Sequence, residues 1–272
     1  MQTSRRVTAP DGVSLAVRES GPTDARAFVL LHGIAQSGRS WDALLDGPLT
    51  ARRRVVAVDL RGHGDSDKPD DVGAFARSHL AGDLAAVIDQ LGLRRPVIVA
   101  WSYGGVVVGE YLRRYGDAAL GGVVWVAAAV KTGRDTRGLY GPTMLDHARA
   151  LLSDEPAVYT AGARAFARGC AASPLDPATL ERIVAEMLRV PPHVRRAFLS
   201  GAEDYTDDVA RTSVPMATVH GEADAVVTTA MSERIEGARE GVGKQRLAGV
   251  GHLPWIEAPG VLEAALVALD PR

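Results

Sequence analysis

The sequence has a single cysteine, almost no excess charge and no long hydrophobic run. Cys170 is the one cysteine among 272 residues, which excludes an internal disulfide and a cysteine-rich metal site. The formal net charge is −2, so no basic field argues for nucleic acid or an anionic membrane. No apolar run is long enough to span a bilayer, and no signal-peptide core follows the basic start. We therefore expect a soluble cytoplasmic protein without a metal.

The overall composition is that of an ordinary globular protein. Hydrophobic residues make up 46% of the chain and charged residues 24%. A length of 272 residues suits one large α/β domain, or such a domain with an insertion. The sequence contains no internal repeat and no low-complexity tract, and nothing in it indicates an oligomer.

Short apolar runs alternate with helical patterns along most of the chain. The runs typical of strands lie at 13–17, 27–31, 54–59, 97–101, 122–127, 216–220 and 244–247. Helical patterns lie at 40–49, 74–91, 106–114 and 259–269. This alternation predicts an α/β fold, with a mostly parallel sheet covered by helices on both faces. Active groups then gather at the carboxyl ends of the strands.

The alternation is interrupted between residues 131 and 212. This segment has no clear strand and is rich in Ala, Arg and Leu, with prolines that divide it into short helices. We expect it to be an inserted helical cap over the strand ends. Residues 1–130 and 213–272 then form the core of the α/β domain.

The most informative motif is Ala100-Trp101-Ser102-Tyr103-Gly104, which follows a buried strand and precedes a helix. A serine at the apex of such a sharp turn takes up a strained backbone and exposes its hydroxyl above the sheet. Small residues two before and two after the serine are needed to avoid clashes. Ala100 replaces the first glycine of G-x-S-x-G, a weaker but acceptable match. Ser102 is therefore a candidate nucleophile, although an ordinary loop serine would fit this motif alone.

A serine nucleophile needs a base, and the base needs an acid to orient it. His252 is the best candidate base, because it lies in a glycine-rich loop after the last predicted strand. Asp224 is the better candidate for the acid, since it follows the preceding strand, and Glu222 is the fallback. No carboxylate follows the strand at 122–127 before Asp135, which strengthens Asp224. The resulting order is Ser, Asp, His.

Two backbone N–H groups are candidates for stabilising an oxyanion. They belong to Tyr103, just after the serine, and to Ile34, just after His32-Gly33. We interpret His32 as structural, shaping its loop through hydrogen bonds.

Taken together, these motifs resemble the α/β-hydrolase fold over nearly the whole chain. The matching segments are 32–33, 59–66, 101–105, 220–224 and 251–254. The resemblance implies a core sheet of about eight strands with a helical cap. Within the fold, the chain is most similar to esterases, cofactor-free haloperoxidase-like enzymes and carbon–carbon-bond hydrolases. We interpret the 61–70 loop as structural, because its glycines and aspartates suit tight turns.

The resemblance implies a serine hydrolase that needs no cofactor and acts on a small molecule. Dehalogenases and epoxide hydrolases of this fold use an aspartate where this chain has Ser102. The substrate expected is a small, apolar or aromatic ester or lactone. A carbon–carbon-bond hydrolase, a lyase or cyclase, and a ligand-binding sensor remain alternatives on the same scaffold.

Large apolar residues flank the candidate catalytic positions and could line a pocket. Those assigned to it are Trp41, Trp101, Leu253 and Trp255. Core packing explains Trp101 and Trp255 equally well. Met144, Phe166, Met187 and Phe198 are further candidates from the helical segment.

Overall fold

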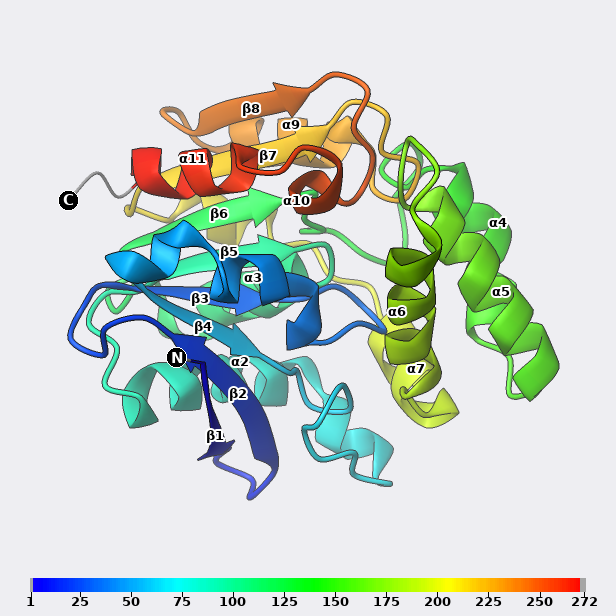
Figure 1. Ribbon diagram of the computed structural model, residues 1–272, viewed down its shortest axis with the longest axis horizontal. Helices are drawn as coiled ribbons and strands as arrows, with labels where there is room; N and C mark the ends of the chain where they lie inside the picture. The colour runs from blue at the N-terminus through cyan, green and yellow to red at the C-terminus, as the bar shows by residue number, and fades with distance from the viewer. Residues whose placement is uncertain (1, 270–272) are drawn as a thin grey trace.

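The computed structural model describes residues 2–269 and has an eight-stranded sheet at its centre (Figure 1). The strands are β1 (Thr3–Thr8), β2 (Ser14–Ser20), β3 (Ala27–Leu31), β4 (Arg54–Val58), β5 (Val97–Trp101), β6 (Gly122–Val126), β7 (Met216–Gly221) and β8 (Gly243–Leu247). Their order across the sheet is β1-β2-β4-β3-β5-β6-β7-β8. The predicted mostly parallel sheet of the α/β-hydrolase fold is confirmed.

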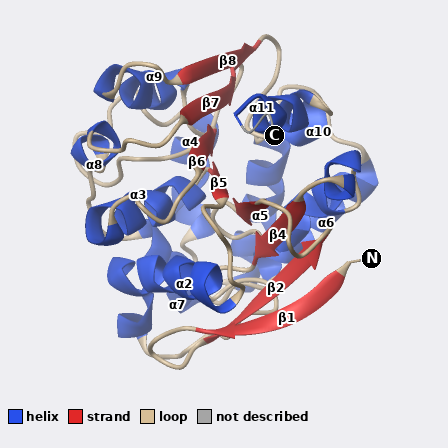
Figure 2. Cartoon of the chain, turned by 90° about the vertical axis from the view of Figure 1, so that its left-hand side faces the viewer, coloured by secondary structure: helices blue, strands red, loops and turns tan. Residues whose placement is uncertain are grey.

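Helices cover both faces of the sheet, because its parallel central strands are joined by crossover connections. β3, β4, β5 and β6 consist entirely of buried residues, as the unbroken apolar runs predicted. Seen along the sheet, α2, α3, α8 and α9 lie on one face and α10 and α11 on the other (Figure 2). β2 runs antiparallel to both of its neighbours, β1 and β4.

The first strand was not predicted from the sequence. β1 pairs with β2 over Thr3–Thr8, yet Val7 is its single buried residue. As an edge strand it carries polar side chains on both faces, so it lacks the alternation that marks a half-buried strand. Its pairing depends on β2, which packs on the core.

The helices are α1 (Asp42–Leu45), α2 (Arg77–Gln90), α3 (Gly104–Tyr115), α4 (Pro142–Leu151), α5 (Pro156–Gly169), α6 (Pro177–Leu188), α7 (Pro192–Leu199), α8 (Thr206–Ala210), α9 (Thr229–Ala238), α10 (Pro254–Glu257) and α11 (Val261–Leu269). Short 3₁₀ helices lie at Gly38–Trp41, Pro48–Ala51 and Val72–Phe75. The single helix expected at 40–49 is therefore wrong: Gly47 and Pro48 divide that segment into short turns. Within residues 2–269, no helix combines the length and apolarity needed to cross a membrane.

Four helices between β6 and β7 lie beyond the carboxyl ends of the central strands (Figure 1). We call α4 to α7 the helical insertion. The chain leaves the sheet and returns to it at one place, where the Thr132 amide donates to the Glu203 carbonyl at 2.8 Å. The Tyr205 amide likewise donates to the Val130 carbonyl at 2.9 Å.

A buried ion-pair cluster holds the loop that follows β4. The Arg61 guanidinium is fully buried and donates to both carboxylate oxygens of Asp83, at 2.7 and 2.5 Å. It also donates to Asp11 at 2.7 Å and to the Ala74 carbonyl at 2.5 Å. Burial raises the pKa of the Asp83 carboxyl, while the Arg61 guanidinium acts in the opposite direction. Each charge is tolerated here because the other is present.

We expect Asp83→Ala to lower the free energy of unfolding by about 3 to 5 kcal/mol, because it leaves the buried positive charge of Arg61 only partly neutralised. Urea denaturation of the two proteins measures this difference. Asp89→Ala, at an exposed position of the same helix, is the matched control and should change little. A loss below about 1 kcal/mol for Asp83→Ala would contradict the assignment.

Candidate active site

Ser102 lies at the turn between β5 and α3, with a strained backbone. Its φ of +52° is in the left-handed region, which L-residues rarely adopt. The backbone is fixed from β6: the Ser102 amide donates to the Val126 carbonyl at 3.1 Å, and the Ala129 amide donates to the Ser102 carbonyl at 2.9 Å. The strained turn expected from the sequence is confirmed.

Gly104, two residues after the serine, must be a glycine because its backbone lies close to β3. A Cβ on Gly104 would lie 2.9 Å from the Leu31 carbonyl oxygen, closer than real Cβ atoms come to any heavy atom. Ala100 is fully buried and tolerated, because it lies within β5 itself. The requirement for small residues is therefore strict after the serine and looser before it.

Asp224 and His252 lie next to each other, as the sequence predicted. The His252 Nδ1 and the Asp224 Oδ2 are 2.7 Å apart, and both side chains are buried. A carboxylate only accepts, so Nδ1 carries the proton and Nε2 is left with a lone pair. Within residues 2–269, no hydrogen bond joins His252 to the Ser102 hydroxyl. Such bonds are often long without substrate and tighten when it binds.

The Asp224 carboxylate is held by four donors. Its Oδ1 accepts from the Val226 and Val227 amides at 2.8 and 3.0 Å. Its Oδ2 accepts from His220 Nε2 at 3.1 Å as well as from His252. Burial would raise the pKa of Asp224, but His252 and the hydrogen bond from His220 outweigh it and lower the pKa to about 2.

The Ile34 and Tyr103 amides, predicted as oxyanion donors, have no acceptor within residues 2–269. Gly33 brings the first loop against the serine, since a Cβ at Gly33 would lie 3.0 Å from the Ser102 Cβ. Ile34, Ser102 and Tyr103 all line the same cavity. Neither amide is thus engaged by another group of the described chain.

Two buried histidines clamp the loop that carries Ile34. The Leu60 amide donates to His32 Nε2 at 3.0 Å, and the Ala35 amide donates to His63 Nε2 at 3.1 Å. Each histidine therefore reaches from one loop to the backbone of the other. Burial lowers the pKa of His32 to about 4 and that of His63 well below its ordinary value, so both stay neutral acceptors. His32 has the structural contacts that the sequence predicted.

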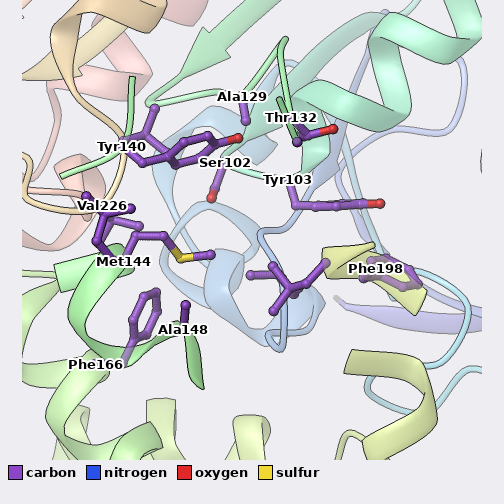
Figure 3. A pocket seen from close by; sticks show the side chains of 15 residues that line it. Ser102, Tyr103, Ala129, Thr132, Tyr140, Met144, Ala148, Phe166, Phe198 and Val226 are labelled. Carbon is purple, nitrogen blue, oxygen red and sulfur yellow. The ribbon is translucent and has the colours of Figure 1, made fainter. Parts of the chain in front are cut away.

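A cavity of about 180 Å³ opens on Ser102, between the sheet edge and the helical insertion (Figure 3). Apolar and aromatic side chains dominate its lining. They include Tyr140, Met144, Phe166, Phe198, Val226 and Val227. The view shows Ser102 and Tyr140 among the residues that line the cavity, with Met144, Ala148 and Phe166 on the side of the insertion (Figure 3).

Comparison with known proteins agrees with this geometry. The model of the alpha/beta hydrolase family matches residues 28–265, which include the serine, the acid and the histidine. The chain belongs to the α/β hydrolase family.

Several relatives and structures of this family are similar over most of the chain. The bifunctional esterase/perhydrolase of Acinetobacter calcoaceticus is 31% identical, and the match covers 81% of this chain and 82% of that protein. The structure of the esterase RhEst1 from Rhodococcus superposes with a TM-score of 0.90 at 30% identity, covering 97% of each chain. The structure of a candidate aryl esterase from Burkholderia cenocepacia superposes with a TM-score of 0.92 at 29% identity. The match covers 99% of this chain and 98% of that one.

One further relative matches less than half of this chain. EphD of Mycobacterium tuberculosis is 44% identical over 117 residues, which are 42% of this chain and 19% of EphD. The match thus spans about a fifth of the length of EphD.

Four residues assigned to the pocket from the sequence lie outside the cavity at Ser102. Trp41 is fully buried, and its ring lies 4.6 Å from that of Trp255, centroid to centroid. Trp101 packs on Trp255 at the same centroid distance and donates from Nε1 to the His252 carbonyl at 3.0 Å. Trp101, Leu253 and Trp255 line a separate cleft of about 20 Å³. The pocket assignment of Trp41, Trp101, Leu253 and Trp255 is therefore corrected: these side chains form the packing behind the histidine loop.

The insertion lines the cavity with residues that the sequence could only suggest. Met144, Phe166 and Phe198 contribute to it, whereas Met187 lines a second, smaller cavity. Tyr140, Val226 and Val227 were missed, because loop residues carry no periodic signal. The sequence motif 220–224 does not by itself indicate a role for His220; its spacing of four residues from Asp224 is the signal that points to their contact.

Residues 2–269 hold no group of three or more His, Cys, Asp or Glu side chains placed to bind a metal ion. Cys170 is buried, and burial raises its thiol pKa well above the ordinary value. A buried protonated thiol is a poor nucleophile.

We expect Asp224 to make stability depend on pH in the acid range. Its pKa is about 2 in the folded protein and 3.8 without perturbation. Ionised Asp224 therefore stabilises the fold fully only above about pH 4. The contribution is lost as the pH falls from about 4 towards 2. Asp224→Asn should therefore be less stable than the parent at pH 6, with a difference that shrinks below pH 4. Urea unfolding at pH 6, 4 and 3 measures it, and a difference independent of pH would contradict the assignment.

Proposed function

We propose that this protein is a serine hydrolase that cleaves a small apolar or aromatic ester through Ser102, His252 and Asp224. The 2.7 Å bond between Asp224 and His252 carries the proposal, because it fixes the tautomer whose Nε2 can act as a base. The role of Ile34 and Tyr103 as oxyanion donors and of the helical insertion as a substrate-covering cap belong to the same proposal.

The first half-reaction forms an acyl-enzyme. The Ser102 Oγ attacks the ester carbonyl carbon while His252 Nε2 takes the hydroxyl proton. The carbonyl oxygen becomes an oxyanion and accepts from the Ile34 and Tyr103 amides. Each such donor typically contributes about 3 kcal/mol to the transition state. The carbon–oxygen bond of the ester then breaks, and the imidazolium returns its proton to the leaving alcohol.

The second half-reaction releases the acid. Water attacks the acyl carbon, and His252 Nε2 takes its proton. The oxyanion again lies on the two amides. When the bond to Ser102 Oγ breaks, the imidazolium protonates the serine oxygen. Asp224 stays ionised throughout and stabilises the imidazolium formed in each half, which its low pKa favours.

The cavity supports a compact substrate. Its volume of about 180 Å³ is close to the ~150 Å³ of an apolar cavity that binds benzene. The aromatic and thioether side chains around it suit a phenyl-sized group. The esterase names of the Acinetobacter and Rhodococcus proteins agree with ester hydrolysis. A lyase or cyclase would use the same cavity without forming an acyl-enzyme.

We expect a fluorophosphonate probe to label the protein at Ser102 and to abolish ester hydrolysis. Ser102→Ala should remain unlabelled and lose about 10⁴-fold or more in kcat on p-nitrophenyl acetate. Intact-mass and peptide analysis locate the adduct. The exposed Ser173→Ala is the matched control and should behave like the parent. Full turnover by Ser102→Ala, or no labelling of the parent, would refute the mechanism.

We expect short acyl chains to be preferred, because the cavity holds a group of about phenyl size. Across p-nitrophenyl esters from acetate to palmitate, kcat/KM should fall by at least about tenfold beyond the hexanoate. Phenyl acetate should be hydrolysed as readily as short alkyl acetates. Equal kcat/KM values across the series would contradict this small cavity as the substrate site.

A further inference from the structure

The Glu257 carboxylate accepts hydrogen bonds from backbone amides around the candidate base. It lies at the end of α10, five residues after His252, and is half-buried. Its Oε1 accepts from the Gly251 amide at 3.0 Å and from the Leu253 amide at 3.4 Å. These are the two residues that flank His252. One carboxylate oxygen therefore holds the backbone on both sides of the imidazole.

The second carboxylate oxygen of Glu257 reaches the segment that follows the helical insertion's α5. Its Oε2 accepts from the Ala172 amide at 2.7 Å. The His252 amide donates to the Cys170 carbonyl at 2.7 Å, two residues earlier. All three amides from Gly251 to Leu253 are thus bound, either by Glu257 or by the carboxyl end of α5.

Backbone packs directly on backbone at this place. A Cβ on Gly251 would lie 2.7 Å from the Cys170 carbonyl oxygen, so only glycine permits the approach. The same helix carries Phe166, which lines the cavity one turn before Cys170 and whose carbonyl accepts from the Cys170 amide at 3.0 Å. The histidine loop and a wall of the cavity are therefore attached to each other.

The contacts of Glu257 are of the kind that fix geometry. Within residues 2–269, no lysine, arginine or histidine forms an ion pair with it. An ionised carboxylate on three backbone amides makes strong, directional hydrogen bonds. Catalysis by a base requires its atoms to be held to within a fraction of an ångström.

We propose that Glu257 is a positioning residue for the catalytic base: it holds the His252 loop against the end of α5, and so fixes the imidazole relative to Ser102. This inference rests on the proposed serine-hydrolase mechanism. Glu257 touches neither substrate nor reacting atoms, and its effect passes through the backbone of residues 251–253.

Two substitutions separate the contacts of Glu257. In Glu257→Ala all three amides lose their acceptor. In Glu257→Gln one oxygen remains, which can serve either the Gly251 and Leu253 amides or the Ala172 amide, because an amide NH₂ cannot accept. Glu263→Gln is the matched control, since its carboxylate on α11 accepts no hydrogen bond within residues 2–269. Leu266→Ala, at a fully buried position of α11, is a control for lost stability alone.

The experiment measures the rate and the end point of fluorophosphonate labelling, together with kcat and KM on p-nitrophenyl acetate. We expect Glu257→Ala to be labelled about 10- to 100-fold more slowly, yet completely, with kcat reduced in parallel and KM nearly unchanged. Glu257→Gln should be intermediate. A merely structural role predicts the behaviour of Leu266→Ala, in which the labelled fraction falls with the folded fraction while folded molecules react at the parent rate.

Each outcome decides the inference. Parent-like labelling rates in both Glu257 variants would overturn it and leave the mechanism intact. A slow rate in Glu257→Gln supports it even where the alanine variant does not fold. If the parent is not labelled at Ser102, the proposed function fails and this inference fails with it.

Discussion

The backbone of Ser102 is the constraint on which the candidate site depends. Its amide and carbonyl are both bonded to the segment that ends β6, and Gly104 lies against β3. The left-handed conformation is therefore imposed by three parallel strands in register rather than by the serine itself. A change in the register of β3, β5 or β6 would relax the turn and move the hydroxyl.

The parts of the site that could be predicted are those that depend on short, local sequence motifs. Ser102, Asp224 and His252 each follow a recognisable strand, and parallel strands bring their carboxyl ends to one edge. The fold followed from the same alternation of apolar runs and helices. β1 was not predicted, because an edge strand with two polar faces has no alternation of apolar and polar residues. The helix predicted at 40–49 is absent, because Gly47 and Pro48 interrupt it.

The parts that could not be predicted depend on contacts between distant segments. Trp41, Trp101 and Trp255 are large and apolar, yet they pack on one another instead of on the cavity. Nothing in the sequence says towards which neighbours an indole turns at the end of a strand or in a short helix. The cavity is lined instead by helices and loops whose placement follows from the packing of the insertion. Likewise, His63 has no local signal for reaching the amide of Ala35, 28 residues earlier.

The closed base of the helical insertion has an evolutionary consequence. Because the chain departs from the sheet and rejoins it at the paired residues Thr132 and Glu203, the intervening helices can be exchanged, lengthened or shortened without altering strand register. A graft would meet conditions at two stretches of core backbone. At the loop after Asp224, it must replace the bonds from the Gly141 and Thr143 amides to the Val226 and Ala225 carbonyls. The other condition is set by the contacts at the histidine loop. The new segment must present a carbonyl where Cys170 has one and an amide where Ala172 has one. The pocket can therefore diversify only as far as these backbone contacts to the core are kept.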